Sequence, residues 1–77
     1  MSIPFRAITA FHAAARTGSM QQAAEILGVT PSAVSQQIQI IETHIGVRLF
    51  SRKGRKSVLT EAGERYYEMI RDEVDRI

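Results

Sequence analysis

The chain has 77 residues, an apolar share of 44% and a net charge of +2, values that suit one small folded domain. It contains no cysteine, which excludes a disulfide framework, thiol chemistry and a zinc finger. No apolar run approaches a membrane span and the first residues lack a signal-peptide layout, so we expect a cytoplasmic protein without a membrane partner.

The charge is unevenly distributed along the chain. Residues 1–60 hold seven basic and two acidic residues, a balance of +5. Residues 61–77 hold three basic and six acidic residues, a balance of −3. This asymmetry implies different partners for the two parts of the chain.

Residues 4–16 are expected to form the first helix, because Pro4 suits a helix start and apolar residues then recur at helical spacing. His12 lies on this apolar stripe. The only other histidine is His44, and two histidines without cysteine make a poor set of metal ligands. We therefore interpret His12 as a packing or capping residue and predict no metal site.

Residues 19–45 predict a short helix, a tight turn and a second helix. Ser19 is a good N-cap, Gly28 suits the end of the first helix, and Thr30 followed by Pro31 suits the start of the second. This is the spacing of a helix-turn-helix, whose second helix usually enters the major groove of DNA. The small residues of the first helix are expected at a close helix crossing.

The start of the first helix of this motif is a candidate phosphate site. Ser19 and Gln22 form a capping-box pattern, and the N–H groups of a helix N-terminus favour an anion. An ordinary capped helix end is the alternative.

The second helix of the motif has two different faces at 100° per residue. One face is apolar and carries Val34, Ile38, Ile41 and Ile45. The other is polar but uncharged and carries Ser32, Ser35, Gln36 and Gln39. Hydroxyl and amide groups both donate and accept hydrogen bonds, so they suit the edges of bases. The alternative is a plain polar surface that lacks charge.

A β-hairpin is expected next, with strands around residues 49–51 and 57–59 and Gly54 in the turn. Val47, Leu49 and Phe50 are expected to reach the core. A basic cluster without any acid occupies this region, namely Arg48, Arg52, Lys53, Arg55 and Lys56. It favours a wing that contacts phosphates or the minor groove over a merely solvated loop.

The last helix is predicted to start after Thr60, with acids in its first turn. Gly63 in this turn is unfavourable for a helix, so we expect close packing there. Apolar positions then recur at helical spacing, at Tyr66, Tyr67, Ile70, Val74 and Ile77. This apolar face is expected either to lie on the domain or to pair with a second copy, which makes these residues the candidate dimer interface.

Two runs, AAEILGVTPSAVSQQIQIIE and IGVRLFSRKGRKSVLTEAG, carry a family resemblance. Together they resemble the N-terminal DNA-binding domain of LysR-type bacterial transcriptional regulators over nearly the whole chain. The resemblance implies a mainly α winged helix-turn-helix over residues 1–59, with a three-helix core and a small β-hairpin wing. It also implies a dimerising linker helix starting at residues 60–77, and a separate effector-binding C-terminal domain that is missing here.

The same resemblance assigns roles to individual positions. It places base reading at Pro31, Ser32, Ser35 and Gln36, phosphate contacts at Thr30 and Arg52, and minor-groove contact at Arg55. Three positions depart from the family pattern, one of them mildly, where Ile41 replaces the usual leucine. Pro31 stands where many members have a base-reading glutamine, and Gln36 stands where an arginine is frequent.

The resulting prediction is sequence-specific binding of double-stranded DNA by a bacterial homodimer, with no cofactor in this chain. A winged-helix module that binds only protein is the alternative. An enzyme is not expected, because the sequence shows no credible catalytic carboxylate pair, Ser-His-Asp set or phosphate loop.

Overall fold

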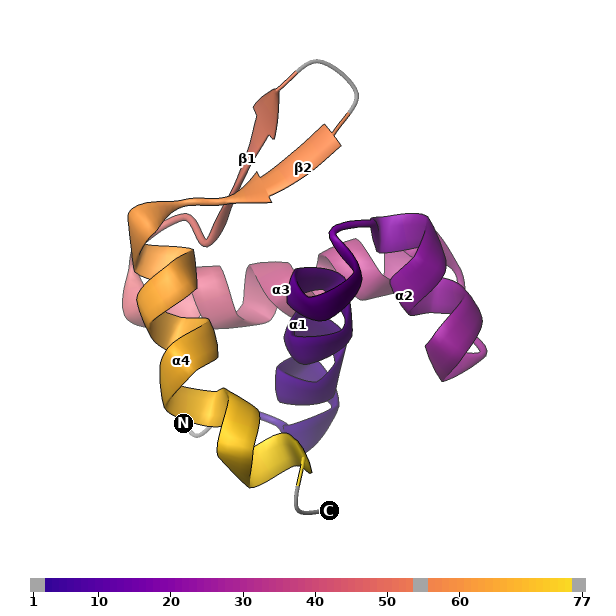
Figure 1. The fold of residues 1–77 in the computed structure, drawn as a ribbon, viewed down its shortest axis with the longest axis horizontal. Helices are drawn as coiled ribbons and strands as arrows, with labels where there is room; N and C mark the ends of the chain where they lie inside the picture. Colours follow the sequence, from indigo (N-terminus) through magenta and orange to yellow (C-terminus); the bar gives the residue numbers. More distant parts are fainter. Residues whose placement is uncertain (1–2, 54–55, 76–77) are drawn as a thin grey trace.

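The computed structural model describes residues 3–53 and 56–75, which form a helical body with a projecting β-hairpin (Figure 1). The elements follow one another as α1 (Phe5–Thr17), α2 (Met20–Leu27), α3 (Pro31–Ile45), β1 (Phe50–Lys53), β2 (Lys56–Leu59) and α4 (Glu61–Asp75). The hairpin rises from one side of the body, and α4 runs away toward the opposite side. This arrangement confirms the predicted winged helix-turn-helix.

The core lies where α1 crosses α2 and α3, and small residues let these helices approach closely. The buried alanines of α1 and α2 are Ala7, Ala10, Ala13, Ala14, Ala23 and Ala24. The predicted close crossing at the start of the motif is therefore confirmed. Larger buried side chains fill the rest of the core, chiefly Phe11, Val34, Ile41 and Leu49.

An aromatic cluster ties the hairpin and the last helix to α1. The Phe11 ring lies edge-on to Phe50 of β1, with centroids 5.5 Å apart. It also lies edge-on to Tyr66 of α4, with centroids 5.1 Å apart. Edge-to-face pairs of this kind add to the stabilisation from area burial alone.

One predicted core position, Val47, is wrong, and the predicted apolar face of α3 is exposed at its last residue, Ile45. Ile45 and Val47 are both exposed, whereas Leu49 and Phe50 are buried as predicted. Gly46 explains the difference, because its positive φ of 78° ends α3 and turns the chain away from the helix axis. The residues on either side of this turn stay at the surface, and the chain re-enters the core only at Leu49.

The predicted helix caps are largely confirmed. Ser19 Oγ accepts a hydrogen bond from Gln22 N at 3.1 Å, and Thr30 Oγ1 accepts one from Ala33 N at 3.1 Å. The capping box is only half formed, because the Ser19 N–H donates to Thr17 Oγ1 at 3.2 Å.

The hairpin pairs its strands antiparallel, with Phe50 opposite Leu59 and Lys53 opposite Lys56. The predicted turn residue, Gly54, lies outside the described residues. Phe50 anchors the base of the hairpin in the core, and the other residues of β1 are exposed.

Helix α4 lies against α1, and the described part of its apolar face packs on the domain, which is one of the two expected arrangements. Ile70 belongs to the buried core, and Tyr67 lies beside the buried His12 with ring centroids 5.6 Å apart. The packing interpretation of His12 is thus confirmed. The division between residues 1–59 and 60–77 stays a prediction.

Gly63 shows the close packing that its position predicted. A Cβ at this residue would stand 2.1 Å from the Leu49 carbonyl oxygen and 2.9 Å from Leu59 Cδ2. The first turn of α4 therefore rests directly on the backbone at the base of the hairpin.

We expect Gly63→Ala to lower the free energy of unfolding by about 1–3 kcal/mol, because the added methyl overpacks a backbone contact. Chemical denaturation followed by circular dichroism measures the change. Glu68→Ala, at an exposed position of the same helix, is the control and should stay within about 0.5 kcal/mol. Equal stabilities for the two variants would contradict the packing argument.

Burial raises the pKa of the Tyr66 phenol above its ordinary value of 10.0. The folded state therefore holds this proton more tightly than the unfolded chain does. The contribution of the protonated Tyr66 phenol to stability is fully present below the ordinary pKa. It is lost as the pH rises through the pKa of this phenol in the folded state.

We accordingly expect Tyr66→Phe to reduce the fall of unfolding free energy on the alkaline side of pH 10.0, while keeping the ring contact with Phe11. Denaturant titrations on both sides of this pH measure it. Tyr67→Phe leaves the Tyr66 phenol in place and should retain the fall. An unchanged alkaline profile in Tyr66→Phe would refute the assignment.

Candidate nucleic-acid interface

Helix α3 separates its residues into a buried face and a polar face, as its spacing predicted. Val34, Ile38 and Ile41 are buried. The opposite face exposes Pro31, Ser32, Gln36 and Gln39, with Ser35 partly exposed. No charged residue occurs in α3 before Glu42, so most of this face offers only hydroxyl and amide groups for hydrogen bonding.

An open groove runs between α3 and the hairpin. Its α3 side includes Pro31, Ser32, Ser35 and Gln39, and its hairpin side includes Ser51, Arg52 and Ser57. The structure therefore brings four of the five predicted base-reading residues together with one predicted phosphate contact. Met20, the first residue of α2, also lines this groove.

Gln36, the fifth predicted base-reading residue, lies outside this groove. It lines a neighbouring hollow with Pro4, Ile40 and His44. Gln39 lines both hollows and so connects the two parts of the polar face. The predicted face is therefore wider than the groove beside the hairpin.

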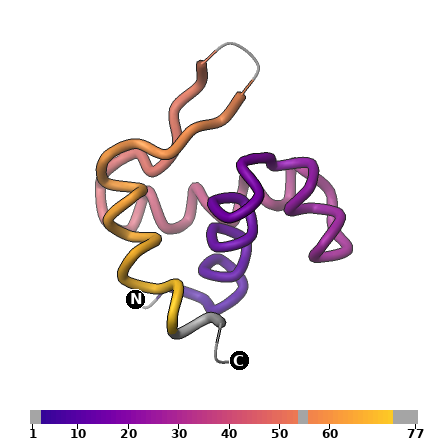
Figure 2. Tube along the Cα trace, viewed as in Figure 1, coloured from indigo at the N-terminus to yellow at the C-terminus, as the bar shows by residue number. Residues whose placement is uncertain are grey.

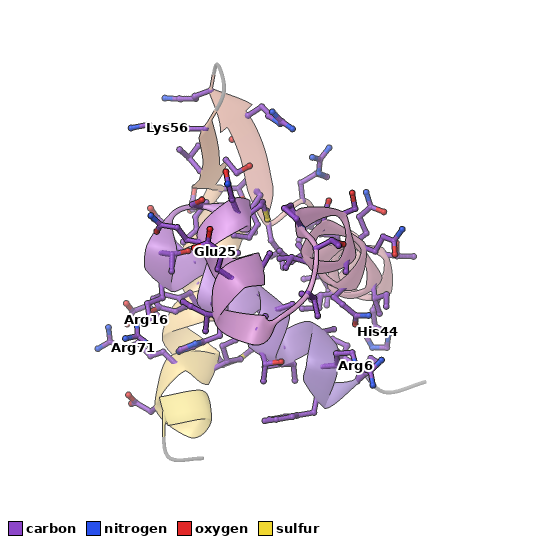
Figure 3. The ribbon with its side chains drawn as sticks, turned by 90° about the vertical axis from the view of Figure 1, so that its right-hand side faces the viewer. Arg6, Arg16, Glu25, His44, Lys56 and Arg71 are labelled. Atoms are coloured by element: carbon purple, nitrogen blue, oxygen red, sulfur yellow. The ribbon has the colours of Figure 1, made fainter. Side chains whose placement is uncertain are left out.

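The basic residues of the hairpin are exposed where the structure describes them. Arg52 and Lys53 lie on β1 and Lys56 on β2, while Arg55 lies outside the described residues. Figure 3 shows Lys56 on the hairpin, well apart from Arg6 and Arg16 on the helical body. The hairpin thus carries positive charge beyond the polar face of α3.

The helix-start candidates do not line the groove. The Ser19 and Gln22 N–H groups are already bonded within the chain, to Thr17 Oγ1 and Ser19 Oγ. Thr30 is exposed at the start of α3, and its hydroxyl is used as the helix cap. Phosphate contact at these three residues stays a prediction.

Glu42 is the residue that sequence reasoning missed. Its side chain is only 12% exposed, and its Oε2 accepts hydrogen bonds from Leu49 N at 2.8 Å and Phe50 N at 3.4 Å. The same oxygen lies 3.6 Å from Arg48 Nε. The available signal was that the one acid of α3 follows directly after the buried Ile41.

The candidate dimer residues divide into separate groups. Tyr66 and Ile70 pack on the chain's own core, and Tyr67 is partly buried beside His12. Ile77 lies outside the described residues, as does the side chain of Val74. Met69, which the helical spacing did not select, is 66% exposed.

The described residues, 3–53 and 56–75, hold no group of three or more potential metal ligands. In the same part of the chain, no helix has the length and apolar character needed to cross a membrane. The groove can therefore form hydrogen bonds through uncharged side chains, and guanidinium and ammonium groups of the hairpin lie beside these side chains.

Comparison with known sequences places this architecture in a family. A family profile described as "Bacterial regulatory helix-turn-helix protein, lysR family" matches residues 5–64. The chain therefore belongs to the LysR family of bacterial regulatory helix-turn-helix proteins.

Individual relatives are transcriptional regulators. The chain is 44% identical over 75 residues to the HTH-type transcriptional activator AmpR of Yersinia enterocolitica. The matched segment covers 97% of this chain and 26% of that protein. It is 45% identical over 69 residues to the glycine cleavage system transcriptional activator of Escherichia coli K12, covering 90% of this chain and 23% of that protein. The chain thus spans about a quarter of the length of these relatives.

A solved structure shares the fold. The DNA-binding domain of CbnR, solved in complex with DNA, is 35% identical, has a TM-score of 0.84, and covers 94% of this chain and 83% of that one. Its likeness spans the helical body and the hairpin together.

Proposed function

We propose that this chain binds double-stranded operator DNA with sequence specificity and regulates transcription as part of a homodimer. The observation that carries the proposal is the groove in which uncharged polar residues of α3 face Arg52 of the hairpin. Membership of the LysR family, and a close structural likeness to a domain solved on DNA, support it.

In this proposal α3 enters the major groove and its polar face reads base edges. Ser32, Ser35, Gln36 and Gln39 supply hydrogen bonds, and a glutamine amide pairs bidentately with adenine. Pro31 offers only an apolar contact. The hairpin lies along the DNA backbone. Its basic residues contact phosphates or the minor groove, namely Arg52, Lys53, Arg55 and Lys56.

Dimer pairing is proposed through α4, as the family resemblance implies. Because Tyr66 and Ile70 pack on the chain's own core, the pairing surface would draw on the exposed side of the helix, where Met69 lies. Two-fold symmetry would then require two half-sites related by a dyad. A small-molecule effector would bind outside this chain, and the bacterial cytoplasm would be the site of action.

One binding-site selection from a random DNA pool tests the proposal. We expect a single consensus with two related halves for the unmodified chain. A protein-binding module without DNA activity would return no enriched sequence and would shift no duplex in a mobility assay. Either of those results would overturn the proposal.

We expect Ser35→Ala and Gln36→Ala to relax the consensus at one base pair each, by about 1–3 kcal/mol of discrimination, because each removes a base-edge hydrogen bond. The selection is repeated with each variant. Glu68→Gln changes an exposed residue of α4 and should return the original consensus. Identical consensus sequences for all four proteins would show that these side chains do not read bases.

We expect Arg52→Ala to weaken binding uniformly across sequences and to make the salt dependence shallower by about one unit of slope, because one phosphate contact is lost. Fluorescence anisotropy over a salt series measures both quantities. Arg65→Ala removes the same charge from an exposed position on α4, where Arg65 pairs with Glu61. An equal loss of slope in both variants would assign the effect to net charge and not to the hairpin.

A further inference from the structure

The direction of the hairpin depends on contacts at its base. The hairpin has two four-residue strands, and most of β1 is exposed. A lone two-stranded hairpin is marginally stable in water. The trace in Figure 2 shows the chain leaving α3, forming the hairpin and returning directly into α4. Residues 48–50 are therefore the point where α3, the hairpin and α4 meet.

Glu42 holds this point from the side of α3. Its Oε2 accepts hydrogen bonds from the N–H groups of Leu49 and Phe50, and it lies beside the Arg48 guanidinium. In the part of the chain that the structure describes, the side-chain hydrogen bonds from α3 to residues 48–50 all come from Glu42. Bonds to an ionised acceptor are stronger than neutral ones, which suits a fixed joint.

Helix α4 holds the same point from the other side. Thr60 Oγ1 donates to the Arg48 carbonyl at 2.7 Å, and Thr60 N donates to the Leu49 carbonyl at 3.0 Å. The carbonyl groups of residues 48 and 49 are thus bound by α4. This leaves the N–H groups of residues 49 and 50 to Glu42.

The charge of Glu42 argues against a direct role on DNA. Residues 1–60 contain two acids, Glu25 and Glu42. Glu25 is exposed on α2, whereas Glu42 is nearly buried in the wall of the groove beside the hairpin. A carboxylate repels phosphate, so a favourable effect of Glu42 on binding to a duplex of random sequence points to the backbone that Glu42 binds.

We propose that Glu42 is a positioning residue that fixes the direction of the hairpin relative to α3. In this role it lets Arg52 and the polar face of α3 engage one DNA duplex together. The DNA-binding part of this inference rests on the proposed function. The structural part, the direction of the hairpin, can be measured without DNA.

Three variants separate the acceptor from the charge. Glu42→Met keeps the length and helix propensity of the side chain but removes the oxygen that binds Leu49. Glu42→Gln keeps an amide oxygen in its place and loses the charge. Glu25→Gln removes the only other acidic charge of residues 1–60 from an exposed position and serves as the charge-matched control. Circular dichroism establishes that each variant is folded.

The first measurement is a spin-label distance between α3 and the hairpin. The chain has no cysteine, so paired substitutions His44→Cys and Lys56→Cys give two unique labelling sites on α3 and β2 (Figure 3). We expect one narrow distance distribution for the doubly labelled chain that keeps Glu42, and the same for the doubly labelled chain with Glu25→Gln. Glu42→Met should broaden it clearly, and Glu42→Gln should lie between the two.

The second measurement is affinity for a random-sequence duplex of about three helical turns over a salt series, with His44 and Lys56 unaltered. We expect Glu42→Met to bind several-fold more weakly, and its salt dependence to be shallower by about one unit of slope. Glu42→Gln should recover most of the affinity. Glu25→Gln should bind at least as well as the unmodified chain, since it only removes negative charge.

The inference is overturned if Glu42→Met matches the unmodified chain in the width of the distance distribution and in salt dependence. If Glu42→Met does not fold, the same comparison is made with Glu42→Gln. The DNA-binding part of the inference is overturned if the distance broadens while affinity and salt dependence are unchanged. A chain that binds no duplex at any salt concentration would refute the proposed function, and with it the DNA part of the inference. The distance measurement would still report whether Glu42 directs the hairpin.

Discussion

The backbone of Leu49 is held from two directions, and the rest of the structure depends on this residue. Its N–H donates to Glu42 Oε2 at 2.8 Å and its carbonyl accepts from Thr60 N at 3.0 Å. The residue is fully buried, so both polar groups need partners inside the protein. Gly63 lets α4 approach the same carbonyl. The backbone of this one residue thereby determines how α3, the hairpin and α4 lie relative to one another.

Most of the fold could be predicted because its determinants are local. The start of α3 follows from Thr30 and Pro31, its buried face follows from the helical spacing of Val34, Ile38 and Ile41, and all of these appear as predicted. The polar face and the basic hairpin were predictable for the same reason. Charge and hydrogen-bonding type are read directly from the residues, and a helix or hairpin determines which of them face outward.

What could not be predicted depends on contacts between distant residues. Nothing in the sequence around Glu42 indicates that its carboxylate reaches N–H groups seven and eight positions further on. The exposure of Val47 follows from the reversal at Gly46, which spacing rules do not capture. Likewise, helical spacing grouped Tyr66 and Ile70 with a candidate dimer surface, although both pack on the chain's own core. Periodicity identifies an apolar face but not which element packs on it.

The division of α3 between a buried face and an exposed face has an evolutionary consequence. The buried face specifies how the helix crosses α1, and the exposed face specifies which chemical groups reach the groove. Because Ser32, Gln36 and Gln39 are exposed, we expect substitutions there to leave the crossing geometry unchanged. A lineage built on this chain can diversify what it recognises one surface residue at a time, without passing through unfolded intermediates. The exposed residues can therefore change what the helix recognises while the buried residues keep its place in the fold.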